Sequence, residues 1–186
     1  MWAMLSGVVM VCIITTVAVA EQAGPFGLTV GKSTYAEVKD IIKQKNGVIL
    51  DEHRPKIDSF YSDRRHIPDI ENPYERVIIA KGLDEHPLGG SSVIFSFFED
   101  ILYKIYMWAE SNDIFQPTYE NLVSKYGFPD SQGDIGTYSE YAEWKEDDIS
   151  INLDKFNNPT LTYINNKLKA KAEARIKVYI QESPRR

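Results

Sequence analysis

Residues 27–34, GLTVGKST, contain the Gly-Lys-Ser sequence of a phosphate-binding loop. Such a loop follows a strand and places four residues between its glycines, so that successive backbone amides can wrap a phosphate. Here Gly27 and Gly31 enclose three residues, and only an apolar N-terminal segment and a turn precede them. We therefore interpret the stretch as the entrance to a helix, in which the Thr34 hydroxyl caps the helix and Glu37 bonds back to the capping amide. No nucleotide binding is predicted.

The histidines are the next candidates for chemistry. His53, His66 and His86 lie in sequence typical of loops and close to acidic residues such as Asp51 and Asp84. No pair has the short helical or turn spacing of a strong metal-ligand motif, and no Ser-His-Asp order or nucleophile elbow is visible. We expect no catalytic residues, metal or cofactor, and therefore no enzyme. One alternative stays open: a periplasmic small-molecule or metal-binding protein, or a hydrolase, that uses the loop histidines.

Residues 51–75 form the one long stretch without a clear period, and it carries three prolines among many charges. Long irregular loops inside a compact domain are often functional. Within this loop Tyr61, Arg64 and Arg65 are candidate partner-binding residues, because aromatic and arginine side chains dominate interface energetics. The alternative is that Tyr61 packs the loop onto the sheet while the two arginines are solvated.

Residues 1–20 carry no charged side chain, and Ala18 and Ala20 supply the small residues that signal peptidase requires. This pattern predicts a secretory signal cleaved after Ala20, and hence a periplasmic or secreted protein. An uncleaved anchor is the alternative, since the apolar stretch approaches the roughly 20 residues that span a bilayer. The single cysteine, Cys12, lies in this segment, so the exported chain would have no disulfide. Val11 before it argues against a lipid anchor.

The formal net charge of −6 argues against a nucleic-acid partner, which would call for a basic patch. The exception is the C-terminal segment, residues 167–181, whose helical spacing predicts an amphipathic helix with a basic outer side. Such a side is ordinarily a solvated surface, and contact with an anionic membrane is the alternative. We expect no membrane contact once the signal is cleaved.

Two segments with helical spacing, residues 34–45 and 117–129, each begin near a Thr-Tyr pair and are each followed by strand-like sequence. Glu99 and Asp100 separate two such stretches and predict a hairpin, and the alternation in ISINLD predicts a sheet with one wet face. The expected fold class is α+β, with two helix-then-antiparallel-sheet repeats packed into one domain plus a C-terminal helix. Residues 21–110 would form the first repeat, and residues 111–186 the second repeat and that helix.

The segment FGLTVGKSTYAEVKDI resembles the start of the helix-then-sheet repeat of BamE-type (SmpA/OmlA) envelope proteins and of the β-lactamase inhibitor protein. In these proteins a Gly-Met-Thr/Ser capping turn precedes a helix with a Glu-Val or Gln-Val pair. The matching residues are Gly31, Ser33 or Thr34, Glu37 and Val38, with Lys32 in place of the usual methionine. The resemblance implies a scaffold or an inhibitor that acts by binding proteins. We therefore expect an exported, non-catalytic protein that binds a protein or peptide of the cell envelope.

Overall fold

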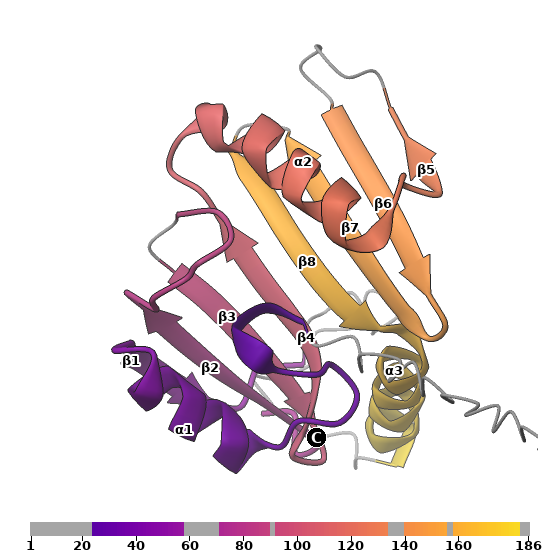
Figure 1. Ribbon diagram of the computed structural model, residues 1–186. Coiled ribbons are helices and arrows are strands. Elements are labelled where there is room, and N and C mark those ends of the chain that lie inside the picture. Colours follow the sequence, from indigo (N-terminus) through magenta and orange to yellow (C-terminus); the bar gives the residue numbers. More distant parts are fainter. Residues whose placement is uncertain (1–23, 58–70, 90–91, 134–139, 156–157, 183–186) are drawn as a thin grey trace, which may run out of the picture.

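The chain folds into an α+β structure built on one antiparallel sheet of eight strands, in the order β1-β2-β3-β4-β8-β7-β6-β5 (Figure 1). The computed structural model describes residues 24–57, 71–89, 92–133, 140–155 and 158–182. The α-helices are α1 (Tyr35–Gln44), α2 (Phe115–Tyr126) and α3 (Asn166–Glu182). The strands are β1 (Val48–His53), β2 (Glu75–Lys81), β3 (Ser92–Phe98), β4 (Ile101–Trp108), β5 (Ser131–Gln132), β6 (Glu140–Glu146), β7 (Ile149–Lys155) and β8 (Pro159–Asn165). The α+β fold class and the C-terminal helix are confirmed.

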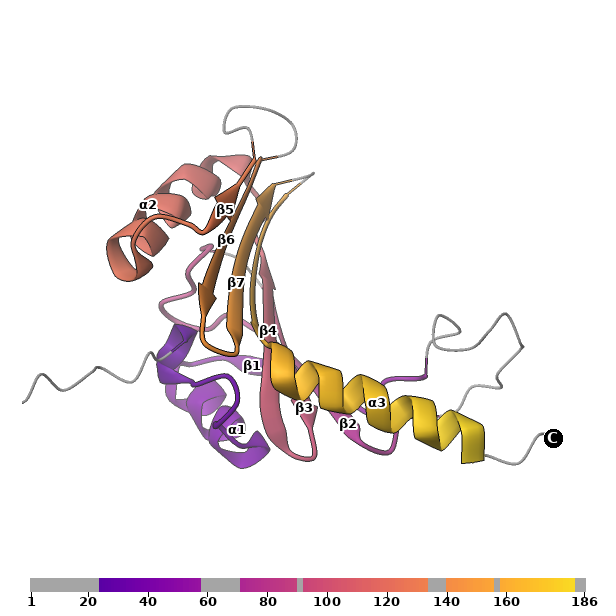
Figure 2. The ribbon, with the colours of Figure 1, turned by 90° about the vertical axis from the view of Figure 1, so that its right-hand side faces the viewer.

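The helices lie on both faces of the sheet. Figure 2 shows the sheet nearly edge-on, with α1 and α2 on one side, here named the inner face, and α3 on the other, the outer face. The wet face expected from ISINLD is therefore partly covered by a helix. Helix α3 follows β8 directly, and its buried Ala172 and Ile176 pack on this face, where the helix contacts β3, β4 and β8.

The first and last four strands form two antiparallel runs, β1 to β4 and β5 to β8, each preceded by a helix. The predicted hairpin at Glu99 and Asp100 is confirmed as the turn between β3 and β4. The two runs meet where β4 pairs with β8, from Lys104 opposite Ile164 to Trp108 opposite Thr160. This pairing makes one continuous sheet.

Hydrogen bonds from backbone amides hold the turn before α1 in place. The predicted capping box is confirmed: the Glu37 amide donates to the Thr34 hydroxyl, and the Thr34 amide donates to the Glu37 carboxylate at 2.7 Å. The Gly31 amide donates to the Leu102 carbonyl at 2.7 Å, and the Lys32 and Ser33 amides donate to the Thr29 carbonyl. These are the amides that a phosphate loop would offer to its ligand, and here they are used within the fold.

Helix α2 begins earlier than its sequence suggested. It starts at Phe115, whose side chain is buried, and Pro117 lies in its first turn, where a missing amide costs no helix bond. Thr118 lies inside α2, buried at 2% exposure, and donates to the Pro87 carbonyl. The Thr-Tyr pairs at residues 34 and 118 are thus not equivalent, since only the first marks a helix start.

The irregular loop expected over residues 51–75 is shorter at both ends. Strand β1 continues to His53, and β2 begins at Glu75. An isolated bridge joins Lys56 to Glu71, and Asn72 is buried, with its side-chain oxygen accepting from the Tyr74 amide. The predicted contacts Tyr61, Arg64 and Arg65, together with His66, lie outside the described residues.

The core lies between the inner face and the two helices that cover it. Trp144 of β6 is its largest fully buried side chain, at 1% exposure. Its indole N–H donates to the Gly127 carbonyl at 2.8 Å, just after α2, so the side chain bonds the helix end to the sheet. Its ring lies 6.0 Å from that of Tyr119 on α2.

Replacing Trp144 with alanine is expected to lower the free energy of unfolding by about 3 to 5 kcal/mol, because it opens a large cavity and leaves the Gly127 carbonyl without its donor. Urea denaturation of the purified protein measures the change. Trp108→Ala is the matched control, because that tryptophan is partly exposed on the outer face. Equal losses for the two variants would contradict this placement of Trp144 in the core.

Candidate binding face

Two aromatic side chains project from the outer face of the central strand β4. Tyr106 and Trp108 alternate with the buried Ile105 and Met107, so they point to the opposite side of the sheet. Their ring centroids lie 5.9 Å apart and both side chains are partly exposed. We call them the aromatic pair.

Partly exposed isoleucines extend this surface away from β8. Ile94 of β3 is directly opposite Tyr106, and Ile79 of β2 is directly opposite Ile94. Both are partly exposed and lie on the same face as the aromatic pair. Neighbouring side chains of this kind interact across a sheet face. The result is an apolar strip across three strands, with aromatic residues at its centre.

On the other side of β4 the strip becomes polar. Trp108 is opposite Thr160, Thr160 is opposite Asp154, and Asp154 is opposite Tyr141. We call these four residues the Trp108 row. Tyr141 is 42% exposed and ends the row with a second aromatic side chain. The row therefore places one exposed carboxylate between two aromatic residues.

Helix α3 leaves this part of the outer face uncovered. It starts at the end of β8, beside the first half of β4, because Ile164 is opposite Lys104. Trp108 and Thr160 are at the other end of these two strands. Figure 2 shows α3 starting at the lower end of β8 and running away from β6 and β7.

The charges beside the aromatic pair are partly desolvated. The Lys104 ammonium lies 5.5 Å from the Tyr106 ring centroid, and burial, followed by the nearby Lys169 charge, lowers the pKa of Lys104. Burial, followed by the Glu143 charge, raises the pKa of the Asp154 carboxyl. Glu143 has a cation of its own, Lys145, at 3.2 Å.

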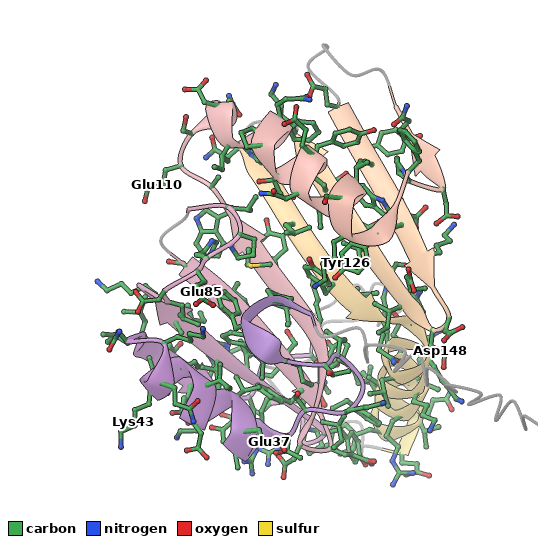
Figure 3. All side chains as sticks on the ribbon, in the orientation of Figure 1. Glu37, Lys43, Glu85, Glu110, Tyr126 and Asp148 are labelled. Atoms are coloured by element: carbon green, nitrogen blue, oxygen red, sulfur yellow. The ribbon has the colours of Figure 1, made fainter. Side chains whose placement is uncertain are left out.

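Among the described residues, the inner face carries most of the buried core. Tyr126, labelled in Figure 3, is the last residue of α2 and forms a hydrogen bond with the buried Tyr163 of β8. Burial raises the pKa of Tyr163 strongly, so this phenol stays protonated. Acidic side chains such as Glu110 and Asp148 are exposed at the periphery in the same view. Tyr126 and Tyr163 therefore belong to the packing between α2 and β8.

The described histidines do not form a common site. His53 lies in β1 rather than in a loop, and its Nδ1 is 2.9 Å from the Asp51 carboxylate. His86 lies in the turn between β2 and β3, with its ring centroid 6.0 Å from that of the buried Phe26. Within the part of the chain that the structure describes, no three His, Cys, Asp or Glu side chains are grouped as metal ligands would be.

The residues of the binding face were not singled out from the sequence. Tyr106 and Trp108 lie in β4, the second strand of the predicted hairpin, and Tyr141 lies in β6. The signal available was alternation: in β4, aromatic residues occupy the positions that alternate with Ile105 and Met107. Since both sets are apolar, only the fold shows which set faces outward.

These features define an α+β domain whose single antiparallel sheet carries an exposed aromatic face. Residues 24–175 match the model of the TP0088 domain, and the chain belongs to the TP0088 domain family. The comparisons gave no match among curated proteins or among solved structures. Among the described helices, none has the length and apolar character needed to cross a membrane.

His86 generates a pH prediction. Its Nδ1 accepts from the Leu88 amide at 3.2 Å, so a ring proton belongs on Nε2, which faces the Ser92 carbonyl. Burial lowers the pKa of His86, so the unfolded chain binds a proton more readily than the folded chain. The stability that depends on neutral His86 is complete above about pH 6.5, the ordinary histidine pKa. It is lost as the pH falls below that value.

His86→Asn retains an acceptor for the Leu88 amide but does not titrate. Urea denaturation of both proteins between pH 7.5 and pH 5 gives the difference in unfolding free energy. We expect wild type to lose stability relative to the variant as the pH falls. A difference that does not change with pH would show that His86 is protonated as readily in the fold as in the unfolded chain.

Proposed function

We propose that this chain is an exported, non-catalytic protein that binds another protein or peptide through the outer face of its sheet. The observation that carries the proposal is the aromatic pair, Tyr106 and Trp108, partly exposed on the central strand and uncovered by α3. Tryptophan and tyrosine are enriched among the residues that dominate protein interfaces. The flanking Ile79 and Ile94 supply the apolar surface that such anchors need around them.

The chemistry of this face favours a polypeptide partner over a small molecule. It is a broad sheet surface that spans strands β2 to β6, with apolar, hydroxyl and charged side chains interspersed. A mixture of aromatic anchors and polar groups is typical of protein interfaces. Small-molecule sites, in contrast, are concave and enclose most of their ligand.

We also propose that the two halves of the chain are copies of one structural unit. Each half is a helix followed by four antiparallel strands, and the fourth strands, β4 and β8, pair with each other. This order supports the resemblance to the repeats of BamE-type envelope proteins and of the β-lactamase inhibitor protein, which act by binding proteins. Residues 1–20, as a cleaved signal, would place the domain in the periplasm or outside the cell.

The test is affinity capture of envelope proteins, followed by measurement of the dissociation constant with the recovered partner. Trp108→Ala and Tyr106→Ala are each expected to weaken binding by about 30-fold or more, as for an interface residue worth about 2 kcal/mol. Phe128→Ala is the matched control: this side chain is 86% exposed but follows α2, away from the outer face. Circular dichroism confirms that each variant is folded.

A partner that binds the Trp108→Ala and Tyr106→Ala variants as tightly as wild type would contradict a role for the outer face, as would recovery of no partner by the intact protein. A variant with Tyr61, Arg64 and Arg65 all changed to alanine tests the sequence-based prediction of a loop contribution. Weaker binding by this variant would extend the binding surface to the loop.

A further inference from the structure

The Trp108 row contains a carboxylate set between aromatic side chains. Asp154 is directly opposite Tyr141 on one side and Thr160 on the other, and Trp108 lies one strand beyond Thr160. Adjacent strands are about 4.8 Å apart, so Tyr141 and Trp108 bracket a span of about three strand spacings.

Asp154 has no cation of its own in the described structure. The ion pairs that the described residues form include Lys145 with Glu143 and Lys155 with Glu140, and none of them includes Asp154. Lys155 is its neighbour in sequence, but its side chain points to the inner face, where it also lies 5.4 Å from the Phe115 ring centroid. The neighbouring charge that acts on the Asp154 carboxyl is that of Glu143, which is also negative. The Asp154 carboxylate is thus exposed to solvent, with a like charge near it.

We propose that the partner inserts a basic side chain, lysine or arginine, against Asp154, between Tyr141 and Trp108. This inference rests on the proposed function and adds the chemistry of the partner's central contact. A cation from the partner would offset the charge of Asp154, whereas Glu143 already pairs with Lys145. Aromatic ring faces attract a cation within about 6 Å of the ring centroid, so one basic side chain can stack on one ring of the row while it bonds Asp154.

Arginine fits this position better than lysine. Its planar guanidinium stacks on aromatic rings and bonds a carboxylate with two parallel N–H groups, whereas an ammonium is a compact, strongly hydrated charge. The uncharged analogue of arginine, citrulline, keeps the shape and most of the donors but lacks the charge. It therefore separates charge recognition from shape recognition.

The first experiment is an NMR titration of the purified protein with N-acetyl-arginine amide and, separately, with N-acetyl-citrulline amide, followed through the Trp108 indole signal. We expect the arginine compound to shift this signal, and at least a tenfold smaller response to citrulline at the same concentration. Asp154→Asn should abolish the difference between the two. Asp148→Asn is the matched control: it removes an exposed aspartate from the turn before β7, at the far end of that strand from Asp154.

The Asp154→Asn protein should be at least as stable as wild type near neutral pH. Burial, followed by the Glu143 charge, raises the pKa of Asp154, so its ionised form is less favourable in the fold than in the unfolded chain. Equal responses to arginine and citrulline, or an unchanged arginine response in Asp154→Asn, would each overturn the proposal. A lower melting temperature for that variant would contradict only the expected stability.

The recovered partner separates this proposal from the broader one. Asp154→Asn is expected to weaken partner binding at least tenfold, with Asp148→Asn unchanged. If Trp108→Ala weakens binding and Asp154→Asn does not, the basic contact is wrong and the outer face remains the binding surface. If neither Trp108→Ala nor Tyr106→Ala weakens binding, the proposed function itself fails.

Discussion

The pairing of β4 with β8 is the interaction on which the rest of the structure depends. Without it the two runs of strands would be separate sheets, each with another open edge exposed to solvent. The turn before α1 is fitted to both strands: the Gly31 amide bonds to Leu102 of β4, and a Cβ on Gly31 would lie 2.5 Å from the Asn165 side chain at the end of β8. Gly31 also has a positive φ of 95°, a conformation that other residues rarely adopt. The glycine that gave the sequence its likeness to a phosphate loop is therefore required by the junction of the two runs.

The same junction divides the outer face into two regions of different character. At one end, α3 covers the sheet, and Tyr179 and Arg175 of that helix pack against Tyr74, at 5.9 and 5.1 Å. At the other end, the ring contacts of Tyr106 and Trp108 among the described residues are with each other and with Lys104. Tyr106 and Trp108 keep part of their apolar surface in contact with water, and that part does not contribute to the stability of the monomer. The contrast between the two ends supports a role in binding for the uncovered one.

Most of the fold followed from local patterns, because helix spacing, strand alternation and the Thr34 cap depend on neighbours in sequence. The features that differ from the sequence-based predictions depend on contacts between residues that are far apart in the chain. Helix α2 starts at Phe115 because that side chain is buried against Lys155 and the sheet, and the two-residue β5 exists only through its pairing with β6. Likewise, nothing within residues 167–181 indicates which face of the sheet α3 will cover. The Trp108 row was missed for the same reason: Trp108 and Asp154 are 46 positions apart in the chain and are brought into one row by the β4–β8 and β7–β8 registers.

Two adjacent residues of β7, Asp154 and Lys155, carry opposite charges on opposite faces of the sheet. Lys155 points inward, where Glu140 is only 6% exposed, and the two form an ion pair at 3.2 Å. Such a pair has to be complete, since a buried charge left alone costs several kcal/mol. Asp154 points outward, where water can hydrate it, so the fold tolerates a carboxylate that no described side chain neutralises. Water is displaced when a partner covers the face, and the carboxylate would then require a cation for the same physical reason that Glu140 does. None of the described ion pairs supplies a cation to Asp154, and in our proposal the molecule that binds supplies it.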